Sequence, residues 1–377
     1  MEGSRNKMKK VLYVLDNNIH NIGGAIKSTF TIIKEMQKLN KYDIYLCMPE
    51  TDVKIDFLEN DKILTYTENK FKNKLINVCF GKMKSIQQII KKVKPDIVHA
   101  QNPQGGMILA MSKKFGKIDK NVECIYTDRQ LFETYSLYYK ICFKFSVEGL
   151  DKVICTTNIN KQQWLKNTKA KVVECVPNVL DAEWYNYDEN KSRKTDKDKI
   201  IVGFAGRFDK YKRWDTVKSI CEYLKDNDEI RFDFCIAAND TKTQEEMKQY
   251  AKELKDLLGK RIELKLNANM KEMEQFYYNI DIFVLTSEGE SFGRTLIEAM
   301  ARRCVVFGTN SGGVPDVIDN KDFLFEVNDV ETISNRILKY VGDTKKMEKD
   351  KCYFEQYVKE RFSVAKLREK LDEIYTR

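Results

Sequence analysis

The chain of 377 residues is short of several residue types and patterns that mark particular classes of protein. It has only two histidines and five prolines, and its ten cysteines include no CxxC pair. Because the cysteines are spread through apolar runs, they favour reduced, buried thiols over a disulfide framework or a zinc site. No apolar stretch reaches the roughly 18 residues that span a membrane, and the first residues lack the apolar core of a signal peptide. We therefore expect a cytoplasmic protein.

What is present is material for two hydrophobic cores. Hydrophobic residues make up 42% of the chain and charged residues 33%, which favours a folded protein over a disordered one. The length exceeds the size at which one core keeps growing, so we expect two domains. The formal charge of +9 suits an anionic partner. Since lysine is common throughout and no nucleic-acid-binding pattern accompanies it, we expect no nucleic acid.

Short β-branched or aromatic runs alternate with longer amphipathic stretches, a pattern typical of α/β domains with parallel sheets. Six runs in the first half and six in the second are predicted to be strands: 11–15, 42–48, 96–99, 122–127, 152–156, 172–176, 200–205, 231–237, 261–266, 281–285, 304–307 and 323–325. Domains are predicted at 8–180 and 200–358, with a polar linker at 181–199. Within 359–377, a helix after Ser363 has an apolar face that needs a docking surface.

The strand predicted at 281–285 is followed by a polar turn and a helix that begins near Gly293. The first amides of a helix lack intrahelical partners and carry partial positive charge, so this turn suits a diphosphate, beside Arg294 and Thr295. Glu298 lies about one helical turn beyond Thr295, where its carboxylate could accept hydrogen bonds from a ribose. Glu290 would then lie on the side of the sugar. Spacing alone leaves a second interpretation open, in which Glu290 is a capping or solvated acid and Glu298 is a surface residue on an amphipathic helix.

Three motifs in the second half resemble those of retaining glycosyltransferases of family GT4. Glu290 and Glu298, with seven residues between them, are similar to the family's paired-glutamate signature. Residues 206–212 are similar to its Gly-Arg-Leu-x-x-x-Lys motif, and residues 311–316 to its Gly-Gly-hydrophobic-Pro-Glu turn, with Asp316 in place of the glutamate. The resemblance implies the GT-B fold. Two Rossmann-like domains would face each other across a cleft, the first for the acceptor and the second for the donor, and the C-terminal helix would return to the N-terminal domain.

The resemblance also implies roles for individual residues. Arg207 and Lys212 would stabilise the leaving diphosphate, and Glu290 would complete the catalytic group. The positions implied to bind the donor are Gly24, Gly206, Ser291, Phe292, Gly293, Arg294, Thr295 and Glu298. On the acceptor side the candidates are His99, which ends a predicted strand, and Arg129, which stands where family members often carry a histidine. A structural role for His99 stays open.

The function implied is retaining transfer of a sugar from a nucleotide diphosphate, UDP by family habit, to a glycan or lipid-linked glycan acceptor. Bacterial-type synthesis of a cell-surface polysaccharide is the expected setting. Neither a metal ion nor a further cofactor is implied, since Arg207, Lys212 and the helix start would supply positive charge. No obligate protein partner is evident. Two alternatives are a GT-B nucleotide-sugar epimerase or phosphorylase, and a non-catalytic subunit that binds nucleotide-sugar.

The aromatic and basic run at residues 131–145 allows two interpretations. Phe132, Tyr135 and Phe143 recur at helical spacings, with Lys140 and Lys144 among them. They fit a helix that packs on the core and carries lysines on its outer edge. They also fit a helix that lies on a membrane surface. The second interpretation would place the protein peripherally at the inner face of the plasma membrane.

Overall fold

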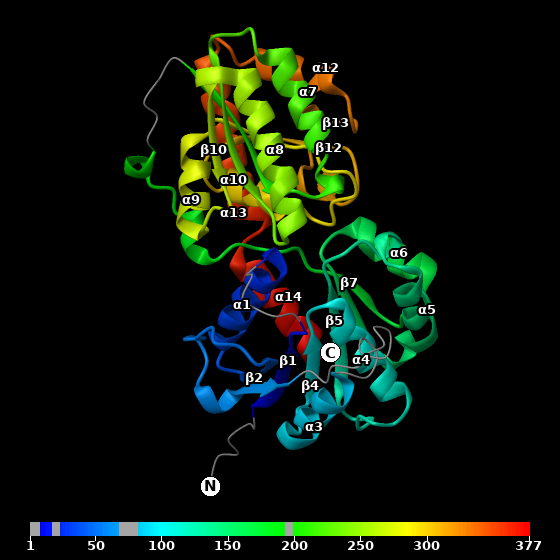
Figure 1. Ribbon diagram of the computed structural model, residues 1–377. Coiled ribbons are helices and arrows are strands. Elements are labelled where there is room, and N and C mark those ends of the chain that lie inside the picture. Colours follow the sequence, from blue (N-terminus) through cyan, green and yellow to red (C-terminus); the bar gives the residue numbers. More distant parts are fainter. Residues whose placement is uncertain (1–7, 17–22, 68–81, 193–198) are drawn as a thin grey trace. The chain divides into compact units, whose positions relative to one another are not determined.

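The structure is a computed structural model that describes residues 8–16, 23–67, 82–192 and 199–377 (Figure 1). Its contacts divide the chain into two units. Unit 1 consists of Met1–Val179 together with Val364–Arg377, and unit 2 of Leu180–Ser363. Each unit is built on its own parallel sheet, with helices packed against the strands. The predicted α/β class is therefore confirmed.

Unit 1 contains seven parallel strands in the order β3-β2-β1-β4-β5-β6-β7. Their bounds are β1 Lys9–Val14, β2 Tyr42–Pro49, β3 Ile63–Tyr66, β4 Ile97–Ala100, β5 Glu123–Asp128, β6 Lys152–Cys155 and β7 Val173–Cys175. Val11, Leu12 and Val14 in the inner strand β1 are fully buried, as expected for a sheet covered on both faces. The sequence analysis missed β3. This four-residue strand lies at the sheet edge, and only Tyr66 in it is buried.

In the described residues of unit 1, six helices cover this sheet. They are α1 Gly24–Gln37, α3 Met83–Val93, α4 Pro103–Lys114, α5 Leu137–Ser146, α6 Asn158–Asn167 and α14 Val364–Thr376. Phe143 of α5 stacks on Tyr126 of β5 with ring centroids 5.5 Å apart, and Trp164 of α6 lies 5.0 Å from Phe143. These fully buried rings anchor α5 and α6 to the sheet.

The C-terminal helix α14 belongs to unit 1, as the resemblance predicted. It lies beside α1, as Figure 1 shows, and buries Leu367, Leu371, Ile374 and Tyr375. Polar contacts fix both of its edges: Lys9 donates to the Tyr375 carbonyl at 2.8 Å, and the Asp372 carboxylate accepts from the Tyr42 hydroxyl at 2.7 Å. The docking surface that its apolar face needs is therefore the core of unit 1.

Unit 2 contains six parallel strands in the order β10-β9-β8-β11-β12-β13. The strands are β8 Ile200–Arg207, β9 Ile230–Ala237, β10 Ile262–Leu266, β11 Ile282–Leu285, β12 Val305–Thr309 and β13 Leu324–Phe325. The helices are α7 Trp214–Leu224, α8 Thr241–Leu258, α9 Met270–Asn279, α10 Arg294–Met300, α11 Val314–Val317, α12 Val330–Leu338 and α13 Thr344–Arg361. All six predicted strands of the second half are present.

The described part of the predicted linker packs within unit 2. The Arg302 guanidinium lies 4.4 Å from the centre of the Trp184 ring and 4.9 Å from that of Tyr278. Trp184 also contacts Tyr277 edge to face at 6.2 Å. In the structure the units therefore divide at residues 179 and 180, rather than across a linker at 181–199. Residues 193–198 of the predicted linker lie outside the described residues.

In both sheets the strand order reverses beside the first strand of the unit, between β1 and β4 and between β8 and β11. Open α/β sheets bind their ligands at such a reversal, beyond the carboxyl ends of the strands. In unit 2 the segments at this point follow β8 and β11, and they contain Arg207, Lys212 and Glu290. The fold thus brings the predicted catalytic residues to the place where a ligand site is expected.

In the part of the chain that the structure describes, no helix combines the length and the apolar character needed to cross a bilayer. The cysteines in the described ranges are free thiols, six of them buried.

Candidate functional site

Lys212 and Glu290 form a close ion pair at the strand reversal of unit 2. The Lys212 ammonium donates to the Glu290 carboxylate at 2.5 Å, and the two side chains are 11% and 15% exposed. Burial disfavours the charged form of Lys212, but the Glu290 carboxylate and Tyr211 together outweigh burial and raise the lysine pKa above its ordinary value. Lys212 therefore holds a fixed positive charge at this site. Gly206 lies against its aliphatic stem, because a Cβ there would be 3.6 Å from it.

Arg207 is the second predicted cation, and it lies closer to solvent. It is 59% exposed at the end of β8, where it donates to the Tyr211 hydroxyl at 2.9 Å and pairs with Asp209 at 3.2 Å. Burial acts against its charge, but Tyr211, Asp209 and Glu290 together raise the Arg207 pKa further. Arg207 is thus a solvent-exposed cation near the Lys212–Glu290 pair.

Two hydrogen bonds to backbone carbonyls tie the loop after β8 to the loop after β11. The Thr286 hydroxyl donates to the Lys212 carbonyl, and the Glu288 amide donates to the Tyr211 carbonyl, both at 2.7 Å. These bonds fix the distance between the two loops and therefore between Lys212 and Glu290. Two motifs separated by about 80 residues in the sequence form one substructure.

The glycine-rich turn after β12 forms hydrogen bonds with the loop that contains Glu290. The Gly313 amide donates to the Glu290 carbonyl at 2.7 Å, and the Gly289 amide donates to the Ser311 hydroxyl at 3.1 Å. Gly312 has a φ of +57°, and a Cβ at this residue would lie 2.3 Å from the Glu290 carbonyl oxygen. Only glycine fits a position with this backbone conformation and this close an approach. All three motifs of the second half therefore meet at Glu290.

Glu298 is a buried carboxylate with two donors, not a surface residue on an amphipathic helix. Arg294, one turn earlier on α10, donates to one carboxylate oxygen at 3.0 Å, and the Tyr277 hydroxyl donates to the other at 3.1 Å. Burial and then the Glu298 charge raise the pKa of Tyr277 well above its ordinary value, so Tyr277 stays a donor. The second interpretation of Glu298 is therefore excluded. The sequence analysis missed Tyr277, because a tyrosine in an ordinary amphipathic helix gives no signal.

The turn before α10 forms as predicted. Gly293 has a φ of +79° and immediately precedes the helix. Phe292 packs edge to face on Phe362 at 5.7 Å, so only its backbone is left for the predicted donor contact. Ser291 is partly exposed in the same turn. The Thr295 hydroxyl is buried and has no hydrogen-bond partner, and since buried hydroxyls normally have one, it is available to a bound polar group.

The remaining predicted site residues lie in unit 1. Gly24 is the first residue of α1. His99 is fully buried, with its Nδ1 2.6 Å from the Tyr375 hydroxyl and its Nε2 2.7 Å from the Thr127 hydroxyl. Burial, assisted by the charge of Arg129, lowers the His99 pKa to about 3. Both ring nitrogens are therefore engaged within the unit, which favours the structural role that the sequence left open.

Arg129 follows β5 and clamps the end of β4. Its guanidinium donates to the carbonyl of Gln101 at 2.9 Å and to the side-chain oxygen of Gln101 at 2.8 Å. The Gln101 amide nitrogen is buried without a partner. Next to Arg129, the buried Asp128 carboxylate accepts from Trp164 at 2.5 Å and from Tyr135 at 2.6 Å. Asp128 thereby fixes the loop that positions Arg129, and neither Gln101 nor Asp128 gave a signal in the sequence.

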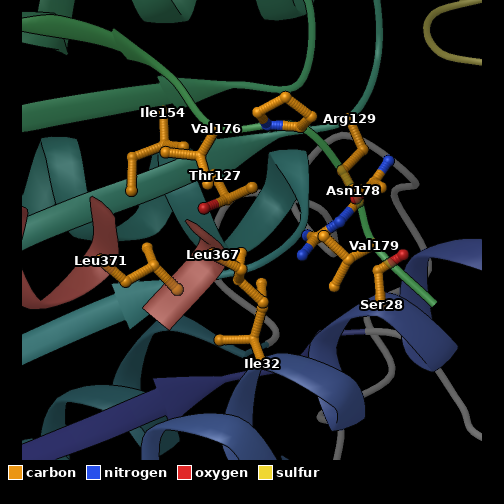
Figure 2. A pocket seen from close by; sticks show the side chains of 11 residues that line it. Ser28, Ile32, Thr127, Arg129, Ile154, Val176, Asn178, Val179, Leu367 and Leu371 are labelled. Carbon is orange, nitrogen blue, oxygen red and sulfur yellow. The ribbon is translucent and has the colours of Figure 1, made fainter. Parts of the chain in front are cut away.

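Beside Arg129 lies a cavity of about 10 Å³ (Figure 2). Its walls come from α1, α14 and the segment after β7, including Ile32, Leu367 and Asn178. This volume holds about one water molecule. The cavity is therefore too small to be a sugar site by itself.

The described residues include no group of three or more histidine, cysteine, aspartate or glutamate side chains that could hold a metal ion.

Two protein-family models match the chain. Glycosyltransferase Family 4 matches residues 22–184, and Glycosyl transferases group 1 matches residues 187–357. One relative is the phosphatidylinositol N-acetylglucosaminyltransferase GPI3 subunit of Saccharomyces cerevisiae, 22% identical over 67% of this chain. The chain spans only 57% of that subunit's length.

Other relatives match over most of both lengths. The capsular polysaccharide biosynthesis glycosyltransferase CapM of Staphylococcus aureus is 25% identical over 78% of this chain and 81% of its own. A UDP-Gal:alpha-D-GlcNAc-diphosphoundecaprenol alpha-1,3-galactosyltransferase of Escherichia coli is 20% identical over 82% of each.

Solved structures share the fold. Anabaena Alr3699/HepE in complex with UDP and glucose matches with a TM-score of 0.79 at 16% identity, over 98% of this chain and 99% of that one. A sucrose-phosphate synthase of Thermosynechococcus elongatus also reaches 0.79, at 15% identity over 98% of each chain. The two family models match successive parts of the chain, and the fold is that of these solved structures. The chain therefore belongs to the GT4-type glycosyltransferases of the GT-B fold.

Proposed function

We propose that the chain transfers a sugar from a nucleotide-diphosphate donor, a UDP-sugar, to a glycan or lipid-linked glycan acceptor, with retention of the anomeric configuration. The observation that carries the proposal is the Lys212–Glu290 pair at the strand reversal of unit 2, held by three separate loops. A fixed cation beside a fixed carboxylate suits a reaction in which a diphosphate leaves and a sugar hydroxyl must be oriented.

Lys212 and Arg207 stabilise the leaving diphosphate in this proposal. Glu290 accepts one hydrogen bond from Lys212, and an ammonium has three N–H donors, so Lys212 can also donate to phosphate oxygens. Arg207 is exposed and can approach the same phosphate from the solvent side. Charge contacts that strengthen as the glycosidic bond breaks lower the barrier, because they favour the transition state over the bound substrate.

The other donor contacts are assigned to the start of α10. The Thr295 hydroxyl and the amides that follow Gly293 would hold the diphosphate. Glu298 would accept hydrogen bonds from the ribose, since a carboxylate has about four acceptor sites and two donors occupy only part of them. Glu290 would bind a hydroxyl of the transferred sugar. Transfer with retention would follow a front-face path, in which the departing phosphate oxygen takes the proton of the acceptor hydroxyl.

UDP is proposed as the carrier on two grounds. The structurally similar HepE has been solved with UDP and with UDP-glucose, and the Escherichia coli relative is named for a UDP-Gal donor. The names of CapM and of the Escherichia coli relative also support a polysaccharide or lipid-linked acceptor. Independence from metal ions remains a prediction.

A thermal-shift panel with UDP, GDP and ADP tests the donor site. A ligand at 100 times its dissociation constant adds about 2.7 kcal/mol to the free energy of unfolding, so we expect UDP to raise the melting temperature most. Transfer or hydrolysis of UDP-sugars is then measured with and without a divalent ion and a chelator. Stabilisation by none of the nucleotides would refute the proposal, and binding without turnover would favour the non-catalytic subunit.

A further inference from the structure

An apolar patch covers the outer face of α5 in unit 1. Leu137, Ile141 and Phe145 are 73%, 58% and 53% exposed, and their spacing of four residues places them on one face of the helix. Phe115, at the end of α4, is 57% exposed and lies 6.2 Å from the Phe145 ring. We call these four residues the α5 patch. They join two helices into one surface.

The position of this patch on the helix is unusual. A helix that packs on a core normally turns its polar face to water. The core contacts of α5 are made on the opposite side, by Phe143 and Ser146, both fully buried. The patch therefore contributes nothing to the packing of α5 on the sheet. Polar side chains at these positions would leave the packing of the monomer unchanged, yet apolar side chains face the solvent. Contiguous exposed apolar surface of this kind marks an interaction site.

Lysines border the α5 patch. The Lys114 ammonium, at the end of α4, lies 4.2 Å from the centre of the Phe145 ring. Lys140 and Lys144 lie on α5 itself. Two acids, Glu133 and Glu148, lie near this border, and Glu148 pairs with Lys114 at 3.5 Å. Lys144 and Lys117 are exposed. The border is thus basic on balance.

The charge of the chain is divided unequally between its units. Unit 1 has 34 lysines and arginines against 21 aspartates and glutamates, whereas unit 2 has 32 against 36. The formal charges are +13 and −4, so unit 1 accounts for the whole positive excess. A basic body with an apolar outer helix complements a surface that is both anionic and penetrable by apolar side chains. A bilayer containing anionic lipid is such a surface.

We infer that the α5 patch docks unit 1 on an anionic lipid bilayer. Leu137, Ile141, Phe145 and Phe115 enter the interface between head groups and acyl chains, and the bordering lysines contact the head groups. The two interpretations of residues 131–145 apply to opposite faces of α5. Phe143 packs on the core, and the α5 patch faces the membrane. The inference goes beyond the proposed function and does not depend on it. Binding to a vesicle that carries no acceptor can be measured whether or not the chain transfers a sugar.

Vesicle flotation of the full chain tests the inference. Vesicles of phosphatidylcholine are compared with vesicles in which about a third of the lipid is phosphatidylglycerol. We expect binding to the anionic vesicles alone. Ile141→Glu should weaken it at least about tenfold, because an apolar contact is replaced by a charge of the wrong sign. Met270→Glu is the matched control, since Met270 is 57% exposed in unit 2, and it should bind as the parent does.

The lysines are tested separately. Each lysine near an anionic surface contributes about fivefold to binding, so Lys140→Gln with Lys144→Gln should weaken flotation by about 25-fold at low salt. Three results would overturn the inference: unchanged binding of Ile141→Glu, equal loss in Met270→Glu, or a dimer of the parent that Ile141→Glu converts to a monomer without vesicle binding. The UDP thermal shift of each variant reports its folding and the donor site independently.

Discussion

At the scale of single residues, the surroundings of Lys212 distinguish it from the other lysines of the chain. Lysines are abundant in this chain, yet this one is buried against Gly206 and paired with Glu290 at 2.5 Å. We expect Lys212→Ala to lower the turnover of sugar transfer by about 100-fold or more, as loss of a charge contact to the leaving group should. Lys210→Ala is the control, because Lys210 is exposed two residues away. Turnover near that of the parent in the Lys212 variant would contradict the assigned role.

Glu298 and Tyr277 provide a graded pair of variants. Glu298→Ala removes the carboxylate and should weaken UDP binding about tenfold, measured by calorimetry. Tyr277→Phe removes only one of its two donors and leaves Arg294 in place, so the loss should be smaller. If Glu298→Ala bound UDP as the parent does, the ribose role would be wrong.

His99 makes the stability of unit 1 depend on pH. Its pKa falls from an ordinary value of 6.5 to about 3 in the folded chain. Below about pH 6.5 the unfolded chain binds a proton here that the folded chain does not. As the pH is lowered from about 6.5 towards 3, the contribution of His99 to the free energy of unfolding therefore falls by about 1.4 kcal/mol per pH unit. Above pH 6.5 this contribution is constant.

The test compares two variants by urea denaturation at about pH 5 and pH 7. His99→Gln should show a shallower dependence on pH than the parent. Tyr375→Phe, which removes one hydrogen bond to the ring but keeps the histidine, should retain the parent's dependence. Parallel curves for all three proteins would show that His99 does not titrate as inferred.

Individual contacts of this kind were only partly predictable. The sequence identified Glu290, Glu298, Arg207 and Lys212 because they stand in a recognisable spacing. It could not identify Tyr277, whose partner Glu298 lies 21 residues away on another helix. A contact between helices depends on how they pack, and no local pattern encodes that packing.

At the scale of elements, the turn after β12 positions Glu290 through its backbone. Gly312→Ala would place a Cβ 2.3 Å from the Glu290 carbonyl oxygen at a φ of +57°. We expect a loss of stability above about 1 kcal/mol and a marked fall in turnover. Gly342→Ala is the control, because its φ of +76° gives similar strain but a Cβ there meets nothing within 4 Å. It should lose stability and keep its turnover; equal turnover of the two variants would contradict the role of the turn.

Strands were the most predictable elements, because their buried β-branched runs read clearly. The exception, β3, lies at the edge of the sheet, where Thr65 is exposed and the apolar pattern is broken. Helix α5 was harder for the opposite reason. Apolar side chains occupy both of its faces, so periodicity alone could not separate the core face from the α5 patch.

At the scale of the whole molecule, the proposed donor contacts lie in unit 2, with Gly24 of unit 1 as the one exception. Hydrogen exchange of the full chain with and without UDP should show added protection in residues 206–213 and 286–296, where the loops around Lys212 and Glu290 lie. The start of α1 at Gly24 is the one segment of unit 1 in which weaker protection is expected. Protection confined to unit 1 would contradict the assignment of the donor to unit 2.

The membership of α14 in unit 1 has a consequence for synthesis of the protein. Unit 2 is one continuous stretch, whereas unit 1 needs residues 364–376, which leave the ribosome after all of unit 2. Domains normally fold in the order in which they are made; here we expect the second unit to be complete first. Until α14 arrives, Tyr13 and His99 lack the Tyr375 hydroxyl, so the buried polar contacts of unit 1 are completed only after the last residues have been made.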